Sequence, residues 1–175
     1  RLWRWNGDAF EMLTTVQGIE GIDQTYIIYA TSQGDVLWVL NNGNLLACDI
    51  VTGDMRNTGV SGVSEIAANP NGGIAAIRLT GDGKEVVSIA SPKAAPVTLA
   101  PLVNATDGGL ACDAATGKLY ATVSGSLSRL DGDRWMPLRP LTRSLGWQNC
   151  TVYSDGFAYT DNNRLFYIPL SEADG

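Results

Sequence analysis

The stretch that decides the fold is Gly117–Leu138, with the sequence GKLYATVSGSLSRLDGDRWMPL. It reads as three short strands separated by two turns, Ser124-Gly125 and Asp131-Gly132-Asp133. Gly, Ser and Asp are typical of tight hairpin turns, because they tolerate positive φ angles or form hydrogen bonds with their own backbone. The stretch therefore predicts three consecutive antiparallel strands.

The same pattern recurs along the chain. Copies of the strand that follows the first turn are RLWRWNG at Arg1, NLLACDIVTGD at Asn44, EVVSIASPK at Glu85, SLSRLDGDRW at Ser126 and RLFYIPL at Arg164. The first apolar residues of these copies are separated by 43, 41, 41 and 38 residues. A period of about forty residues is in the range of β-propeller blades.

Each repeat contains four candidate strands, a, b, c and d, and the copies above are strand c. Strand a is represented by TYIIYA, VSEIAA, GLACDA and QNCTVY, and the more polar strand d by AFEML, MRNTGV, APVTLA and RWMPL. This order predicts an all-β fold, a β-propeller of four-stranded antiparallel blades, formed as a single domain over residues 1–175. A β-sandwich or another antiparallel meander is the alternative.

The number of blades follows from the strand order. Along the chain, strands c and d come first, three whole four-stranded units follow, and strands a, b and c come last. This order corresponds to about four to five blades. Because both ends carry a c-like strand, pairing of the two ends would duplicate one strand. We therefore expect either a ring with an irregular closing blade or part of a larger propeller. The chain begins at Arg1 without a methionine, which favours a piece excised from a longer chain.

The segment Gly117–Leu138 resembles a blade of the sensor-type and Kelch-like propellers, in which a b strand is followed by a Gly-rich turn, a c strand and an aromatic residue. RLWRWNGDAFEML resembles the second half of the same pattern. The sequence has no WD dipeptide at a strand end, no Kelch double glycine and no S-x-D-x-G-x-x-W box. The resemblance thus implies a fold and leaves the function open.

The composition excludes several classes of protein. Eighteen acidic and twelve basic residues give a net charge of −6, which repels a phosphate backbone and argues against nucleic-acid binding. The absence of histidine removes Ser-His-Asp and Cys-His catalytic arrangements and HExxH metal sites. No apolar run is long enough to insert into a membrane, and no phosphate-binding glycine motif occurs, so no cofactor is predicted.

The cysteines and acidic turns suggest no metal site. Cys48, Cys112 and Cys150 have no metal-ligand spacing, and we expect them to be free, buried side chains. One disulfide between neighbouring blades is the alternative. Acidic turns such as Asp131-Gly132-Asp133 offer oxygens to calcium but do not match the twelve-residue calcium loop, so turn formation is the favoured interpretation.

The tryptophans are the best candidates for recognition. Trp38, in VLWVL, is predicted to pack between blades, whereas Trp3 and Trp5 alternate along a strand and share a face. Tryptophan beside arginine is typical of binding hot spots and of sugar-stacking platforms, with packing between blades as the competing interpretation. The candidate ligand-binding residues are Trp3, Trp5, Arg134 and Trp135, and Trp147 is a further tryptophan near a predicted strand start.

These observations favour a non-catalytic recognition module that binds a protein or carbohydrate partner through propeller loops, for example in receptor binding or adhesion. Low charge and turn-rich strands favour an extracellular or surface-exposed setting. One alternative is a glycoside hydrolase or lyase, which requires acidic residues to converge in a central channel. The acids to follow are Asp23, Asp49, Glu65, Asp113 and Asp161. The other alternative is a structural spacer or assembly domain.

Overall fold

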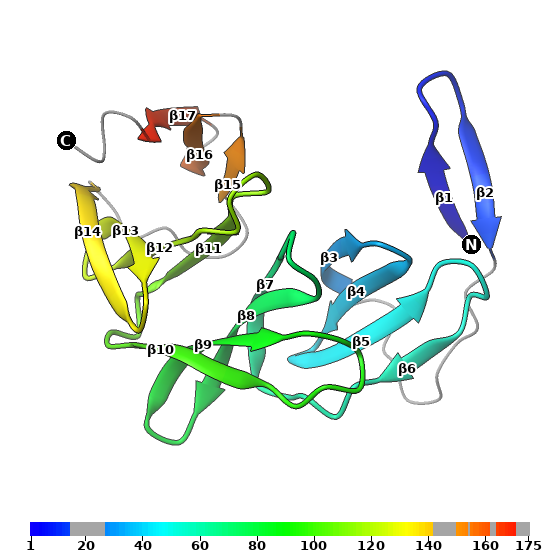
Figure 1. Cartoon of the computed structure of the whole chain (residues 1–175), viewed down its shortest axis with the longest axis horizontal. Helices are drawn as coiled ribbons and strands as arrows, with labels where there is room; N and C mark the ends of the chain where they lie inside the picture. The colour runs from blue at the N-terminus through cyan, green and yellow to red at the C-terminus, as the bar shows by residue number, and fades with distance from the viewer. Residues whose placement is uncertain (15–26, 142–149, 154, 162–163, 171–175) are drawn as a thin grey trace.

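The computed structural model describes residues 1–14, 27–141, 150–153, 155–161 and 164–170. Within these ranges the chain forms seventeen strands, which pair in antiparallel fashion into five sheets (Figure 1). Among the described residues, no helix is long and apolar enough to cross a membrane. The all-β prediction is confirmed.

The strands follow the predicted repeats. The N-terminal hairpin consists of β1 (Leu2–Trp5) and β2 (Phe10–Thr14). The first complete sheet contains β3 (Ile27–Gln33), β4 (Val36–Asn41), β5 (Asn44–Asp49) and β6 (Met55–Asn57). The second contains β7 (Val63–Ala68), β8 (Ile74–Thr80), β9 (Gly83–Ile89) and β10 (Val97–Leu102). The third contains β11 (Gly108–Cys112), β12 (Leu119–Val123), β13 (Ser126–Asp131) and β14 (Arg134–Pro140). The C-terminal sheet contains β15 (Cys150–Tyr153), β16 (Gly156–Asp161) and β17 (Arg164–Pro169).

Two of the predicted Asn/Gly and Ser/Gly turns are two-residue hairpin loops. Asn42 and Gly43 have φ angles of 46° and 76°, and Ser124 and Gly125 have φ angles of 50° and 77°. The flanking strands remain in register directly beside each loop. Positive φ at both central residues matches the right-handed twist of the strands. These local sequences therefore determine the register of β4 with β5 and of β12 with β13.

The sheets follow one another around an arc rather than stacking as two layers (Figure 1). The first strand of each sheet contacts the first strand of the next, in the order β3, β7, β11 and β15. Side chains between successive sheets form three apolar clusters. This is the radial arrangement of a propeller, in which each sheet buries its apolar faces against its neighbours.

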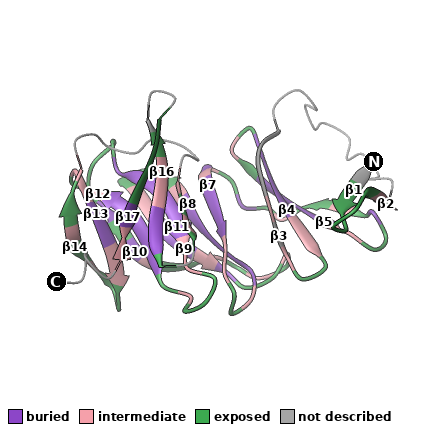
Figure 2. Cartoon of the chain, turned by 90° about the horizontal axis from the view of Figure 1, so that it is seen from above, coloured by how far each residue is buried: buried purple, intermediate pink, exposed green. Residues whose placement is uncertain are grey.

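The cluster between the first two complete sheets illustrates the packing. It includes Trp38 from β4, Leu45 from β5, Ile66 from β7 and Ile74 from β8. Trp38 is 1% exposed, which confirms its predicted position between blades. Figure 2 shows buried residues in all three complete sheets, whereas the N-terminal hairpin is largely exposed.

The two ends of the arc are incomplete. The N-terminal hairpin has two strands and the C-terminal sheet has three, and β17 does not pair with β1 or β2. The hairpin and the C-terminal sheet lie at opposite ends of the arc (Figure 1). Within the described part of the chain, the strands form an open arc and not a closed ring.

Candidate functional site: an apolar face on the N-terminal hairpin

The N-terminal hairpin has one apolar and one polar face. Trp3 lies opposite Met12 in the register, and Trp5 lies opposite Phe10. Directly opposed residues in an antiparallel pair point to the same side, and alternate residues along each strand do so as well. The exposed fractions are 49% for Trp3, 55% for Trp5, 68% for Phe10 and 51% for Met12. We call these four residues the hairpin apolar face.

Two aromatic rings on this face support each other. The ring centroids of Trp5 and Phe10 are 5.2 Å apart and their planes meet at 61°, an edge-to-face arrangement. This geometry is favourable for aromatic pairs, because the positive edge of one ring meets the negative face of the other. The two rings thus hold each other in place although more than half of each residue remains exposed.

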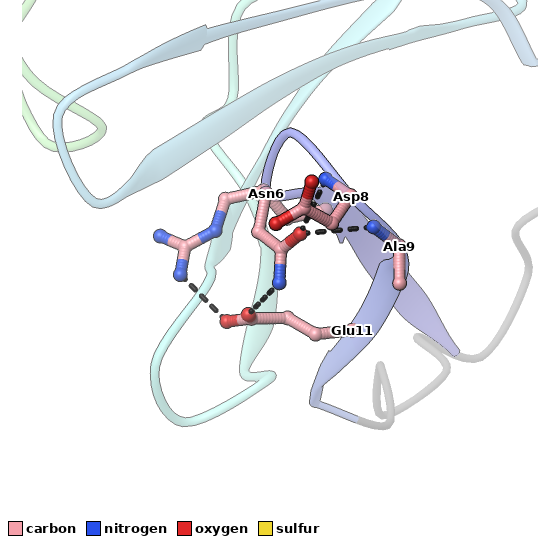
Figure 3. Close-up of polar contacts among 5 residues, drawn as sticks. Asn6, Asp8, Ala9 and Glu11 are labelled. Atoms are coloured by element: carbon pink, nitrogen blue, oxygen red, sulfur yellow. Dashed lines mark hydrogen bonds and ion pairs between the residues drawn. The ribbon is translucent and has the colours of Figure 1, made fainter.

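The opposite face of the hairpin is polar and holds the turn in place (Figure 3). Arg4 donates to a carboxylate oxygen of Glu11 at 2.6 Å, and the Asn6 side-chain amide donates to the other oxygen at 3.2 Å. The Asn6 side-chain oxygen accepts from the backbone N–H groups of Asp8 and Ala9, both at 3.0 Å. These bonds lower the pKa of Glu11, with the Arg4 hydrogen bond as the main cause.

The structure does not bring the four predicted binding residues into one site. Trp3 and Trp5 lie on the hairpin, whereas Arg134 and Trp135 lie on β14 towards the other end of the arc (Figure 1). Trp135 is half-buried and packs against the cluster between the second and third complete sheets. Its indole N–H donates to the carbonyl of Pro101 at 3.0 Å. Only part of its ring is left for a ligand.

The Arg134 side chain is highly exposed and forms one weak ion pair. Its guanidinium lies 3.9 Å from the carboxylate of Asp133, and both side chains are almost fully exposed. Exposed ion pairs of this kind contribute little to stability. Trp147 and Asp23 lie outside the described residues, so the structure places neither.

Three of the five acidic residues proposed for a central channel, Asp49, Glu65 and Asp113, form separate local hydrogen bonds. The Asp49 carboxylate accepts from the N–H groups of Val51 and Thr52, both at 2.9 Å, and Asp113 forms an equivalent turn. Glu65, on β7, is buried and accepts from the N–H of Leu110 on β11 at 2.8 Å. Among the described residues, no three His, Cys, Asp or Glu side chains group as a metal site.

The three cysteines are free thiols, and Cys48 is buried as expected, whereas Cys112 and Cys150 are only partly buried. Removal from water nevertheless shifts the pKa of all three thiols. It raises the pKa of Cys112 to about 11 and that of Cys150 to about 12, and it raises the pKa of Cys48 as well. Because the thiolate is the nucleophile, a thiol held protonated in this way is unreactive near neutral pH.

A shallow pocket of about 230 Å³ lies where the first and second complete sheets meet. It is lined by Val36, Ala47, Asp49, Arg56, Ser91, Pro92 and Lys93. The two cationic residues, Arg56 and Lys93, are exposed, and the Asp49 carboxylate is already used by the adjacent turn. The pocket is thus an open surface depression with charges of both signs.

Phe10 and Met12 were not among the predicted binding residues, although the sequence contains the signal for them. They alternate with Glu11 in the same way as Trp3 and Trp5 alternate with Arg4. Tyr153, Leu165 and Tyr167 on the C-terminal sheet are also exposed. Their exposure results from the position of that sheet at the end of the arc, which no local pattern reveals.

The arrangement of sheets places this chain in the class of β-propeller-like folds. It is similar to a chain in the crystal structure of a nidogen/laminin complex, with a TM-score of 0.64 and 17% identity over 80% of this chain. This chain spans little more than half of that chain, 57% of its length. The computationally designed Ika4 protein is also similar, with a TM-score of 0.57 and 15% identity over 91% of this chain and 98% of Ika4. No protein-family model and no curated protein matches the sequence.

Proposed function

We propose that this chain is a non-catalytic recognition module that binds a protein partner through the hairpin apolar face. The observation that carries the proposal is the group of four large apolar side chains, each about half exposed or more, on one side of a two-stranded hairpin. Contiguous exposed apolar patches of this kind mark interaction surfaces, and tryptophan is enriched in their energetic centres. The similar nidogen/laminin structure, itself a complex of two proteins, is consistent with this role.

The chemistry of the face favours a protein over a carbohydrate. Sugar binding combines a flat aromatic platform with polar groups that bond to the hydroxyls. Here the polar residues Arg4, Asn6 and Glu11 bond to one another or to the turn, and Trp5 and Phe10 are tilted by 61°. An extracellular or surface-exposed setting, with the chain acting in adhesion or receptor binding, remains part of the proposal.

The test compares the wild-type chain with the double variant Trp5→Ala, Phe10→Ala. Proteins captured from a cell-surface extract by the immobilised wild-type chain are purified, and their dissociation constants are measured with both chains. We expect the double variant to bind at least about thirtyfold more weakly, since truncating a hot-spot residue costs about 2 kcal/mol or more.

Val97→Ala is the matched control, because Val97 is an exposed apolar residue on a different outer strand. It should leave binding unchanged. Equal binding by the double variant would contradict the proposal, and glycan-array binding that depends on Trp5 would favour the carbohydrate alternative.

A further inference from the structure

We propose that the pocket between the first and second complete sheets binds a small organic carboxylate, with Arg56 and Lys93 as the residues that contact its charged group. Both side chains line the pocket, which has a volume of about 230 Å³. The pocket shares no residue with the hairpin apolar face, so carboxylate binding and protein binding can be tested separately.

Two walls of different origin form this pocket. On the first complete sheet, Val36 lies opposite Asp49 and Ala47 lies opposite Arg56. Directly opposed residues share a side of a sheet, and so do alternate residues of one strand, so all four point the same way. The other wall is the loop Ser91–Lys93 between β9 and β10, which lies beside β5 and β6 (Figure 1).

The loop that carries Lys93 is a turn with a defined shape. The Ala94 N–H donates to the Ser91 carbonyl at 3.0 Å, so Pro92 and Lys93 are the two central residues of a four-residue turn. Proline is favoured at the first central position, because its ring fixes φ at about −65°. A wall that is ordered before binding lowers the entropic cost of holding a ligand.

The two cationic side chains of the pocket are not neutralised by ion pairs. Among the described residues, neither Arg56 nor Lys93 forms one. The Asp49 carboxylate accepts from the N–H groups of Thr52 and Val51, which are the main cause of its lowered pKa, whereas the charge of Arg56 is the smallest influence on it. Two positive charges are thus left for an anion, and carboxylates form strong charge-assisted hydrogen bonds with such groups.

A buried hydrogen-bond donor lies in the same cross-strand row as two of the lining residues. Trp38 lies opposite Ala47, which in turn lies opposite Arg56. Trp38 is 1% exposed, and its indole N–H has no hydrogen-bond partner within the described part of the chain. An unpaired buried donor costs free energy. A ligand oxygen that reached past Ala47 would pair with this N–H.

The size and the lining of the pocket select the class of anion. Pockets for drug-sized ligands have volumes of roughly 300–1,000 Å³, so this smaller pocket fits a small molecule. Val36, Ala47 and Pro92 offer apolar surface that a hydrocarbon chain would cover and an inorganic phosphate ion would leave in water. A carboxylate on a short hydrocarbon chain matches both the charged and the apolar parts.

The test uses hexanoate as the probe and two-dimensional NMR of the ¹⁵N-labelled chain. Each of the five tryptophans has one indole N–H resonance, and Trp38→Phe assigns that of Trp38 by its loss. We expect hexanoate to shift this resonance with a dissociation constant of about 1 mM. Arg56→Gln and Lys93→Gln should each weaken binding at least about tenfold, because each removes a charge-assisted hydrogen bond.

Arg134→Gln is the matched control, because Arg134 is an exposed cation on β14 and does not line the pocket. It should bind hexanoate as the wild type does, and hexanol, which has the same chain without the charge, should not bind. The inference is wrong if hexanoate gives no saturable shift up to about 20 mM. It is also wrong if both pocket variants bind like the wild type, or if inorganic phosphate binds as tightly as hexanoate.

The double variant Trp5→Ala, Phe10→Ala separates this site from the proposed protein-binding face. We expect it to bind hexanoate with wild-type affinity, because neither residue lines the pocket. Normal hexanoate binding together with unchanged protein capture would contradict the proposed function alone. Loss of hexanoate binding in this variant would contradict the location of the carboxylate site.

Discussion

At the scale of single residues, the same side chain has different roles according to what lies opposite it. Trp5 and Trp135 both occur beside a turn and near an arginine. Trp5 faces Phe10 across a two-stranded hairpin and is exposed among the described residues. Trp135 lies against the second complete sheet and bonds to Pro101, 34 residues earlier in the chain. Trp135 therefore contributes to stability, whereas Trp5 keeps more than half of its surface exposed.

This difference predicts opposite effects of the same substitution. Trp135→Phe removes the indole N–H and leaves the Pro101 carbonyl without that donor, so we expect a loss of about 1 kcal/mol in the free energy of unfolding. Trp5→Phe, the matched control, should change it by less than about 0.5 kcal/mol, since no buried partner is lost. Urea unfolding followed by circular dichroism measures both values. Equal destabilisation would contradict the assigned roles.

At the scale of elements, the completeness of a sheet determines how firmly it is held. The second and third complete sheets pack against apolar clusters on both faces, whereas the described part of the C-terminal sheet has three strands and packs against one cluster. Elements with fewer buried contacts open at lower free energy. The three cysteines lie on β5, β11 and β15 and so report on three different sheets.

Thiol labelling should therefore follow the order of the sheets. In native buffer we expect slow reaction of all three cysteines with a thiol reagent, because burial raises their pKa values. At urea concentrations below the main unfolding transition, Cys150 should react first, at least about tenfold faster than Cys48 and Cys112. Peptide mass spectrometry identifies the labelled residue. Simultaneous labelling of all three would indicate that the sheets open together.

At the scale of the whole molecule, successive sheets are connected by polar contacts in addition to the apolar clusters. The Glu65 carboxylate on β7 accepts from the backbone of β11, so it joins the second complete sheet to the third. Burial is the largest influence on Glu65 and raises its pKa above the ordinary value near 4.5, although the Leu110 N–H acts in the opposite direction. Lys84 lowers the pKa slightly.

The raised pKa makes stability depend on pH with a definite sign. Between the unfolded and folded pKa values, the folded chain binds more protons, so Glu65 makes the free energy of unfolding fall as pH rises, by at most about 1.4 kcal/mol per unit. Glu65→Gln cannot ionise. We therefore expect the variant to gain stability relative to the wild type between pH 4 and pH 7. Urea unfolding across this range measures the difference.

The Glu65→Gln variant must be compared with the wild type at each pH, because other carboxyl groups change the free energy of unfolding in the opposite direction as pH rises. Asp49, Asp113 and Glu85 have pKa values lowered by hydrogen bonds, so their contributions are lost as pH falls. These contributions are common to both chains and cancel in the difference. A constant difference between Glu65→Gln and the wild type would show that the Glu65 pKa is not raised.

The sequence by itself determined the strands, the turns and the repeat of this protein. Asn42-Gly43 and Ser124-Gly125 are hairpin loops, and the Leu2, Leu45, Val86, Leu127 and Leu165 copies fall on equivalent strands. Such features were predictable because positive φ angles and the two-residue alternation depend on neighbours within a few positions. The burial of Trp38 was predictable for the same reason, since it lies within an apolar run.

Only the tertiary structure decided which surfaces are covered. It separated Trp135 from Trp3 and Trp5, buried Glu65 between two sheets, and left Phe10 and Met12 exposed. A strand side chain is hidden or exposed according to the sheet that lies opposite, which is tens of residues away in the chain. The alternation of apolar and polar residues specifies two faces of a strand, whereas the packing of the sheets decides which face is available to a partner.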